Sequence, residues 1–139
     1  MFLSSCAGQQ PQHIGVKDQS LAQCKSTPNC VSSFANKERH QIPALELELS
    51  AEQAWPIVNQ LIRNNSAAQI ISLRKGYLHA EYTSRTMRFI DDLELLVSPD
   101  TKRIDVRSAS RIGYSDGGVN RTRIESLRAD LIKLGVVRK

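Results

Sequence analysis

The sequence lacks several features that would assign a function directly. No apolar run approaches the ~20 residues of a membrane-spanning helix, and aromatic residues make up only 5% of the 139 positions. The phosphate-binding P-loop, the zinc motif H-E-x-x-H and the dinucleotide motif G-x-G-x-x-G are missing. The histidines, His13, His40 and His79, have no metal-ligand spacing. We therefore expect no metal and no cofactor, and an enzyme is the less favoured class.

Basic residues exceed acidic ones, with 19 Lys and Arg against 14 Asp and Glu, which raises the question of nucleic-acid binding. Between residues 85 and 123, however, seven arginines and one lysine are interleaved with six acidic residues. Interleaved charges favour internal ion pairs over a continuous track for phosphates. Few aromatic side chains are available to stack on bases. We therefore expect no nucleic-acid partner.

The N-terminus carries a pattern that resembles a bacterial lipobox, Leu3-Ser4-Ser5-Cys6, in which small residues precede a lipid-modified cysteine. The basic and apolar regions of a signal peptide do not precede it, so either a longer precursor supplies them or the match is fortuitous. The pattern predicts a periplasm-facing protein of the cell envelope, held at the membrane by a lipid on Cys6. The alternative is a cytosolic N-terminus with an isolated cysteine.

Two further cysteines, Cys24 and Cys30, flank a Pro-Asn turn. Such a turn brings two Cα atoms within reach of a disulfide, and disulfides are typical of envelope proteins. We expect this pair to be disulfide-bonded. Free thiols are the main alternative, and a metal site or a nucleophilic cysteine is less favoured because the spacing is wide and no second cysteine pair exists.

The chain length leaves room for one hydrophobic core. Residues 1–20 are predicted to be the lipobox-like N-terminus and a flexible tether, and residues 21–139 to be one α+β domain. Within this domain, residues 21–43 are polar and proline-containing without apolar periodicity, which is typical of an irregular ordered segment. Residues 44–139 contain the periodic segments and form the predicted core.

The periodic segments follow the order strand, helix, four strands, helix. Alternating Leu and Glu predict a strand at 45–49, and Ser50 with Gln53 predicts a capped helix to about residue 63. A final helix is predicted from Asn120, as its cap, to about Gly135. The four strands between the helices are predicted at 68–74, 77–84, 86–97 and 103–112. This order predicts a single curved antiparallel sheet of about five strands with both helices on one face, similar to the TATA-binding-protein-like and helix-grip folds.

The hairpin around Asp100 allows the strand register to be predicted. Val97 is expected opposite Ile104, with the next apolar pair also facing inward. On the other face the same register places Glu94 opposite Arg107, as an exposed cross-strand pair. The inner face should therefore change from apolar near the hairpin to polar at its far end.

The polar end of the inner face gives the candidate site. Asp91 faces inward there and needs a hydrogen-bonded or charged partner. One interpretation is that Asp91 anchors the following loop and the last helix. The other is that a group of polar side chains lines one site at the end of the sheet. The candidate residues are Asp91, Ser108, Ser110, Arg111, Ser115, Asp116, Asn120 and Arg121.

Several segments resemble the bacterial and plastid family catalogued as domain of unknown function 1499, and the resemblance runs from about Cys24 to Leu131. It implies an envelope or lumenal protein, in some members with lipoprotein signals, and it implies no settled activity. Gly117 departs from the apolar residue more usual in the family. The segments that carry the resemblance are 28–33, 77–81, 84–85, 89–94, 106–116, 118–121 and 123–125.

These observations predict a non-enzymatic envelope lipoprotein that binds a small molecule, a lipid or a protein in a cleft between sheet and helices. The alternative is an envelope enzyme of unidentified reaction. It would use the polar residues Asp91, Ser110, Arg111, Asp116 and Arg121.

Overall fold

The computed structural model describes residues 8–139, so Cys6 lies outside the described residues. Six strands and two α-helices follow one another along the chain. No helix in this part of the chain is long and apolar enough to cross a membrane. The strands are β1 (Cys30–Ser32), β2 (Leu45–Glu46), β3 (Ala68–Arg74), β4 (Tyr77–Thr83), β5 (Ile90–Ser98) and β6 (Arg103–Ser110), and the helices are α1 (Ala51–Arg63) and α2 (Val119–Lys133).

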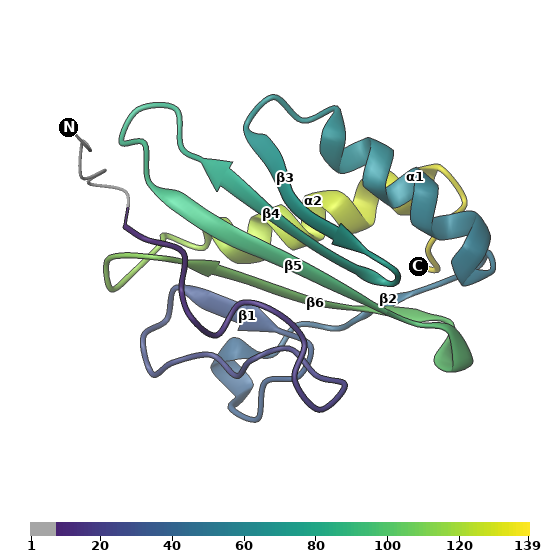
Figure 1. Ribbon diagram of the computed structural model, residues 1–139, viewed down its shortest axis with the longest axis horizontal. Helices are drawn as coiled ribbons and strands as arrows, with labels where there is room; N and C mark the ends of the chain where they lie inside the picture. The colour runs from purple at the N-terminus through teal and green to yellow at the C-terminus, as the bar shows by residue number, and fades with distance from the viewer. Residues whose placement is uncertain (1–7) are drawn as a thin grey trace.

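All six strands belong to one open antiparallel sheet, in the order β1-β6-β5-β4-β3, with β2 also paired to β6 (Figure 1). The predicted α+β class with a single antiparallel sheet is confirmed. The sheet has one strand more than expected, because β1 comes from the segment predicted to be irregular. The predicted strand at 45–49 is shorter, and the segment at 86–97 becomes a strand only from Ile90.

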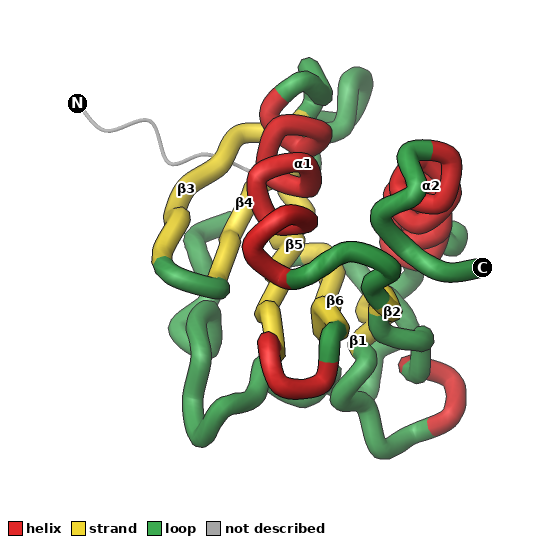
Figure 2. The backbone as a smooth tube through the Cα atoms, turned by 90° about the vertical axis from the view of Figure 1, so that its right-hand side faces the viewer, coloured by secondary structure: helices red, strands yellow, loops and turns green. Residues whose placement is uncertain are grey.

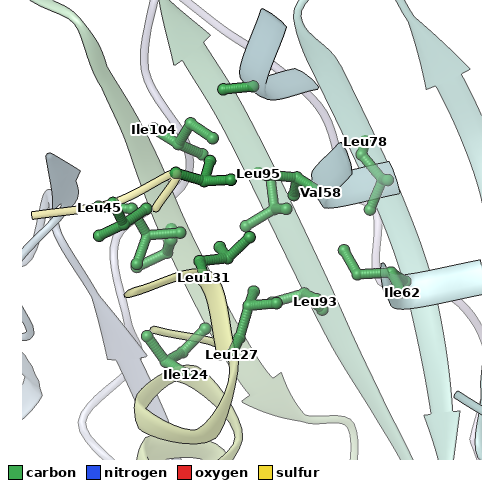
Figure 3. Packing of buried hydrophobic residues seen from close by; sticks show 14 of the residues in the cluster. Leu45, Val58, Ile62, Leu78, Leu93, Leu95, Ile104, Ile124, Leu127 and Leu131 are labelled. Carbon is green, nitrogen blue, oxygen red and sulfur yellow. The ribbon is translucent and has the colours of Figure 1, made fainter. Parts of the chain in front are cut away.

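Both helices pack on the same face of the sheet, which we call the inner face (Figure 2). α1 contributes Ala54, Val58 and Ile62, and α2 contributes an apolar stripe of its own. These side chains meet the inward-facing residues of β4, β5 and β6 in one hydrophobic core (Figure 3). Burial of this apolar surface is the main force that holds the helices on the sheet.

The register predicted for the hairpin is confirmed: Val97 pairs with Ile104 and Glu94 with Arg107. The helix caps differ. Ser50 forms the predicted capping box of α1 with Gln53. Asn120, predicted as the cap of the last helix, lies instead inside its first turn and is fully buried, and Gly118 takes the cap position with φ of 83°.

The outer face of the sheet is covered over β5 and β6, and this corrects the expected exposure of the Glu94–Arg107 pair. Glu94 is 0% and Arg107 2% exposed. The N-terminal segment crosses this face (Figure 1, purple): Gly15 donates its N–H to Glu94 at 2.9 Å, and Arg107 donates to the carbonyl of Ala22 at 3.0 Å. From residue 8 onward, the segment predicted as a flexible tether therefore lies against the sheet.

Candidate functional site

A buried polar network connects the far end of the inner face to the start of α2. Asp91 on β5 accepts a hydrogen bond from Arg123 at 2.7 Å. Arg123 also donates to Ser108 at 3.0 Å and to Asn120 at 2.8 Å. Asn120 in turn donates to Ser110 at 2.9 Å. Every one of these groups has a partner, which is the arrangement required of polar side chains in a core.

Asp116 fixes the beginning of α2. Its carboxylate accepts hydrogen bonds from the backbone N–H groups of Gly118 at 2.9 Å and Asn120 at 3.1 Å, and from the Asn120 side chain at 2.9 Å. Burial acts to raise the pKa of Asp116, but these hydrogen bonds outweigh it and hold the pKa below its usual range. The helix N-terminus is thus occupied by a carboxylate of the chain itself.

The structure brings together five of the predicted site residues: Asp91, Ser108, Ser110, Asp116 and Asn120. It separates the other three. Arg111 lies on the outer face, where it binds Asp92 and Glu81. Arg121 donates to backbone carbonyls of Gln41 and Arg39, and Ser115 is exposed in the loop before α2.

Two functional candidates were missed at this end of the sheet, Arg123 and Tyr82. The guanidinium carbon of Arg123 lies 4.6 Å from the centroid of the Tyr82 ring. Burial raises the pKa of the Tyr82 hydroxyl, and the charge of Arg123 opposes that shift. The spacing of Arg123 from Asn120 could have indicated its role. Positions three residues apart on a helix share a face, and Asn120 faces inward.

The loop before α2 also contains a short motif known from serine hydrolases. Residues 113–117 read Gly-Tyr-Ser-Asp-Gly, which matches the G-x-S-x-G of serine nucleophile elbows. The Ser115 hydroxyl accepts a bond from the Gly117 N–H at 3.4 Å. Within residues 8–139 it has no hydrogen bond to a histidine or a carboxylate, so the base that activates such a serine is not in place.

A groove of about 570 Å³ opens between α1 and α2 above this network. Its apolar wall is formed by Leu61 and Ile62 from α1 and Leu127 from α2, and Tyr82 and Arg123 also line it. Its polar lining is formed by Asn64, Asn65, Thr122, Ser126 and Asp130. Pockets of this volume, with mostly apolar walls and a few polar groups, are typical of small-molecule sites.

The outer face carries a second buried network, made of charged side chains. Asp92 pairs with His79 at 2.7 Å and with Arg111 at 2.9 Å. Burial acts to raise the pKa of Asp92, but the hydrogen bonds from Arg111 and His79 prevail and lower it. Glu94 accepts a bond from the Tyr77 hydroxyl at 2.7 Å. Sequence alternation correctly placed these acids outward but did not reveal their burial.

Cys24 and Cys30 form the predicted disulfide, with Cα atoms 5.7 Å apart. The loop they close is fixed to the sheet, because Asn29 donates to the carbonyl of Gly113 at 2.9 Å and its own carbonyl accepts from the Ser110 N–H at 3.0 Å. Among the described residues, no group of three or more His, Cys, Asp or Glu side chains is placed to hold a metal ion.

The fold and its networks define a class: an α+β domain with an open antiparallel sheet, two helices on one face and an irregular N-terminal segment on the other. The chain belongs to the family described as "Protein of unknown function (DUF1499)", whose model matches residues 20–131. The resemblance drawn from the sequence is thereby confirmed, and the matched region contains the disulfide, the polar network and the groove. No curated protein and no solved structure matches the chain.

Proposed function

We propose that this protein is a non-enzymatic, lipid-anchored domain of the cell envelope that binds a small, largely apolar molecule in the groove between α1 and α2. The observation that carries the proposal is the groove itself, with its volume of about 570 Å³ and an apolar wall beside Tyr82 and Arg123. A volume of this size holds a ligand of drug-like dimensions.

The polar groups around the groove, which include the exposed carboxylate of Asp130, disfavour an anionic ligand. The positive charge of Arg123 is already balanced by Asp91, and both of its terminal nitrogens donate to protein oxygens. A ligand carboxylate would have to compete with Asp91 for this guanidinium. Hydroxyl and carboxamide side chains, such as those of Thr122, Ser126 and Asn64, remain as hydrogen-bonding groups along the groove. The proposed ligand is therefore a neutral amphiphile with hydroxyl or amide groups.

Two observations support the envelope location and the anchor. The disulfide is of the kind that persists in oxidising compartments. The backbone of Gly8 lies against Ile112, at the end of the sheet that carries both the β4–β5 and the β6–α2 loops (Figure 1). These loops carry the exposed apolar side chains Met87, Phe89 and Tyr114. A lipid on Cys6 would thus attach close to an end of the domain that is itself suited to a membrane surface.

Mass spectrometry of protein isolated from its native cells tests the anchor. We expect an N-terminal peptide that begins at Cys6 and carries a diacylglycerol group. An unmodified Cys6 within a longer, unprocessed chain would contradict the anchor and leave the groove unaffected.

Binding in the groove can be tested with N-phenyl-1-naphthylamine, a neutral apolar dye whose fluorescence rises in apolar sites. We expect saturable binding to the wild-type protein and at least ten-fold weaker binding to Ser126→Trp, whose indole would fill the groove. Ala129→Trp is the matched control, because Ala129 is exposed on the same helix outside the groove. Equal affinity of both variants, or no saturable binding to the wild type, would overturn the proposal.

The enzymatic alternative draws less support from the geometry. Its residues were Asp91, Ser110, Arg111, Asp116 and Arg121, of which the two arginines lie away from the other three. The remaining side chains hydrogen-bond to one another through Asn120 and Arg123. Groups that are fully satisfied within a core are suited to holding structure rather than to transferring protons or attacking a substrate.

A further inference from the structure

A second cavity, of about 250 Å³, lies on the opposite face of the sheet from the groove. Its floor includes Arg107 and Arg111, and its cover includes His13 from the N-terminal segment and Lys25 from the disulfide loop. Asp92 is the carboxylate among the lining residues. Cationic side chains therefore reach the cavity both from the sheet and from the segment that covers it.

The charges around this cavity are unequally satisfied. The Asp92 carboxylate already accepts hydrogen bonds from His79 and Arg111. Lys25, by contrast, has no ion pair or hydrogen bond from its amine to any described residue, and its side chain is exposed at the cavity rim. Arg107 faces the carboxylate of Glu94, and Arg111 faces those of Asp92 and Glu81. At the cavity, the charge left without a partner among the described residues is therefore that of Lys25, and it favours an anion.

Arg107 supplies the observation that points to a ligand. It is only 2% exposed, and its Nη1 has no hydrogen-bond partner among the described residues. Nη1 forms an ion pair with Oε1 of Glu94 at 3.6 Å, a distance too long for a hydrogen bond, and Oε1 is likewise without one. A buried guanidinium with an unsatisfied N–H is costly. Burial lowers the pKa of Arg107, while the charges of Glu94 and Asp92 act in the opposite direction.

His13 reports the same excess of positive charge from the other side of the cavity. Burial lowers its pKa first, and repulsion from Arg107 and Lys25 lowers it further, while Asp92 acts in the opposite direction. Arg107 and Lys25 thus disfavour the imidazolium form of His13, and Asp92 favours it. A bound anion would add negative charge and shift the equilibrium of His13 towards the imidazolium form.

We propose that this cavity binds a small free oxyanion of the phosphate class, held by Arg107, Lys25 and His13, with Arg111 contributing positive charge. Donors that approach from the sheet and from its cover surround a tetrahedral oxyanion better than a planar carboxylate, which accepts mainly in its own plane. The cavity, of about 250 Å³, has room for a small oxyanion together with water, and it lies beneath the N-terminal segment. The proposal is independent of the groove on the inner face.

Isothermal titration with inorganic phosphate, against chloride at equal ionic strength, tests the site. We expect saturable binding to the wild type and at least five-fold weaker binding to Lys25→Gln. Lys17→Gln is the matched control, because it removes the same charge from the N-terminal segment outside the cavity. We expect this control to bind within two-fold of the wild type. No saturable binding, or an equal loss in both variants, would overturn the proposal.

The pKa of His13, measured by NMR of its imidazole, gives a second test, because nonspecific binding of phosphate elsewhere would not change this pKa. Saturating phosphate should raise the pKa of His13 towards or above the ordinary histidine value, because a bound anion stabilises the imidazolium form. Lys25→Gln should lose most of this phosphate-dependent change. A His13 pKa that is the same in phosphate and in chloride would contradict the site even if heat of binding were observed.

Discussion

Arg123 donates a hydrogen bond to Asp91 at 2.7 Å while its guanidinium lies over the ring of Tyr82, 4.6 Å from the centroid. One side chain thus ties β5 and β4 to the first turns of α2 and also lines the groove between the helices. The same contacts that hold the helix on the sheet therefore shape the proposed binding site. Removal of Arg123 or of Asp91 should therefore be detected first as a loss of stability.

Removal of the Asp91 carboxylate should destabilise the fold. Asp91→Ala leaves Arg123 largely buried without its charge partner, and we expect a loss of about 2–4 kcal/mol in the free energy of unfolding. Arg121→Ala is the control, because Arg121 contacts only exposed backbone carbonyls, and it should cost less than about 1 kcal/mol. Urea unfolding measures both. Equal losses in the two variants would show that Asp91 is not an anchor.

The inward placement of Asp91, Ser108 and Ser110 could be predicted, because the apolar and charged pairs of the hairpin agree on one register. The partner of Asp91 could not be predicted as securely. With Asn120 expected as a cap outside the helix, its side chain was not placed on the face towards the sheet, and nothing distinguished Arg123 from Arg121 as the partner of Asp91. In the structure Asn120 is buried within the first turn, and Arg123, three residues further on, reaches the sheet.

Burial of the outer face could not be predicted from strand alternation. Alternation assigns Glu94 and Arg107 to a face but does not say what covers that face. The covering segment has no apolar periodicity, and it contacts the sheet through backbone groups such as the Gly15 N–H and the Ala22 carbonyl. Backbone contacts of this kind depend little on side-chain identity and leave no pattern in a sequence.

The Glu94–Arg107 pair should behave as a buried pair. Arg107→Ala would leave the Glu94 carboxylate buried without a cation, and we expect a loss of about 3–5 kcal/mol. Glu94→Gln combined with Arg107→Met should recover part of this loss, since neither member of this pair would then carry a buried charge. Thermal and urea unfolding of the single and double variants measure the effect.

The exposed pair Glu48–Arg138, at 3.4 Å and with both side chains more than half exposed, is the natural comparison. Glu48→Ala should change stability by no more than about 0.5 kcal/mol. If Arg107→Ala were as mild as Glu48→Ala, the outer face would have to be open to solvent in solution.

Reduction of the Cys24–Cys30 disulfide should loosen the loop that carries Lys25 and Asn29. We expect a loss of about 2 kcal/mol, because the closed loop is short. Mass spectrometry should show that reduction adds the mass of two hydrogen atoms, and alkylation should require reduction first. Alkylation of both thiols in the untreated protein would contradict the disulfide and weaken the assignment to an oxidising compartment.

The carboxylate of Asp116 should make stability depend on pH at the acid end. Its folded-state pKa lies below its usual value, since the hydrogen bonds from Asn120 and the Gly118 N–H outweigh the opposing effect of burial. A depressed pKa contributes stability that is fully present above the unfolded value of about 3.9 and is lost as the pH falls through the folded value.

Asp116→Asn keeps an acceptor near the N-terminus of α2 but removes the charge. At pH 7 we expect it to cost about 1 kcal/mol, the usual scale for a helix-capping group that is partly screened by solvent. The difference from the wild type should shrink as the pH falls below about 4, because the wild-type carboxylate then also becomes neutral. Asp100→Asn, in the exposed turn of the hairpin, is the control and should cost no more than about 0.5 kcal/mol at pH 7. Urea unfolding at pH 7, 5 and 3 compares the three proteins. A stability difference between Asp116→Asn and the wild type that stays constant over this range would show that the hydrogen-bond geometry, and not the charge of Asp116, holds the start of α2.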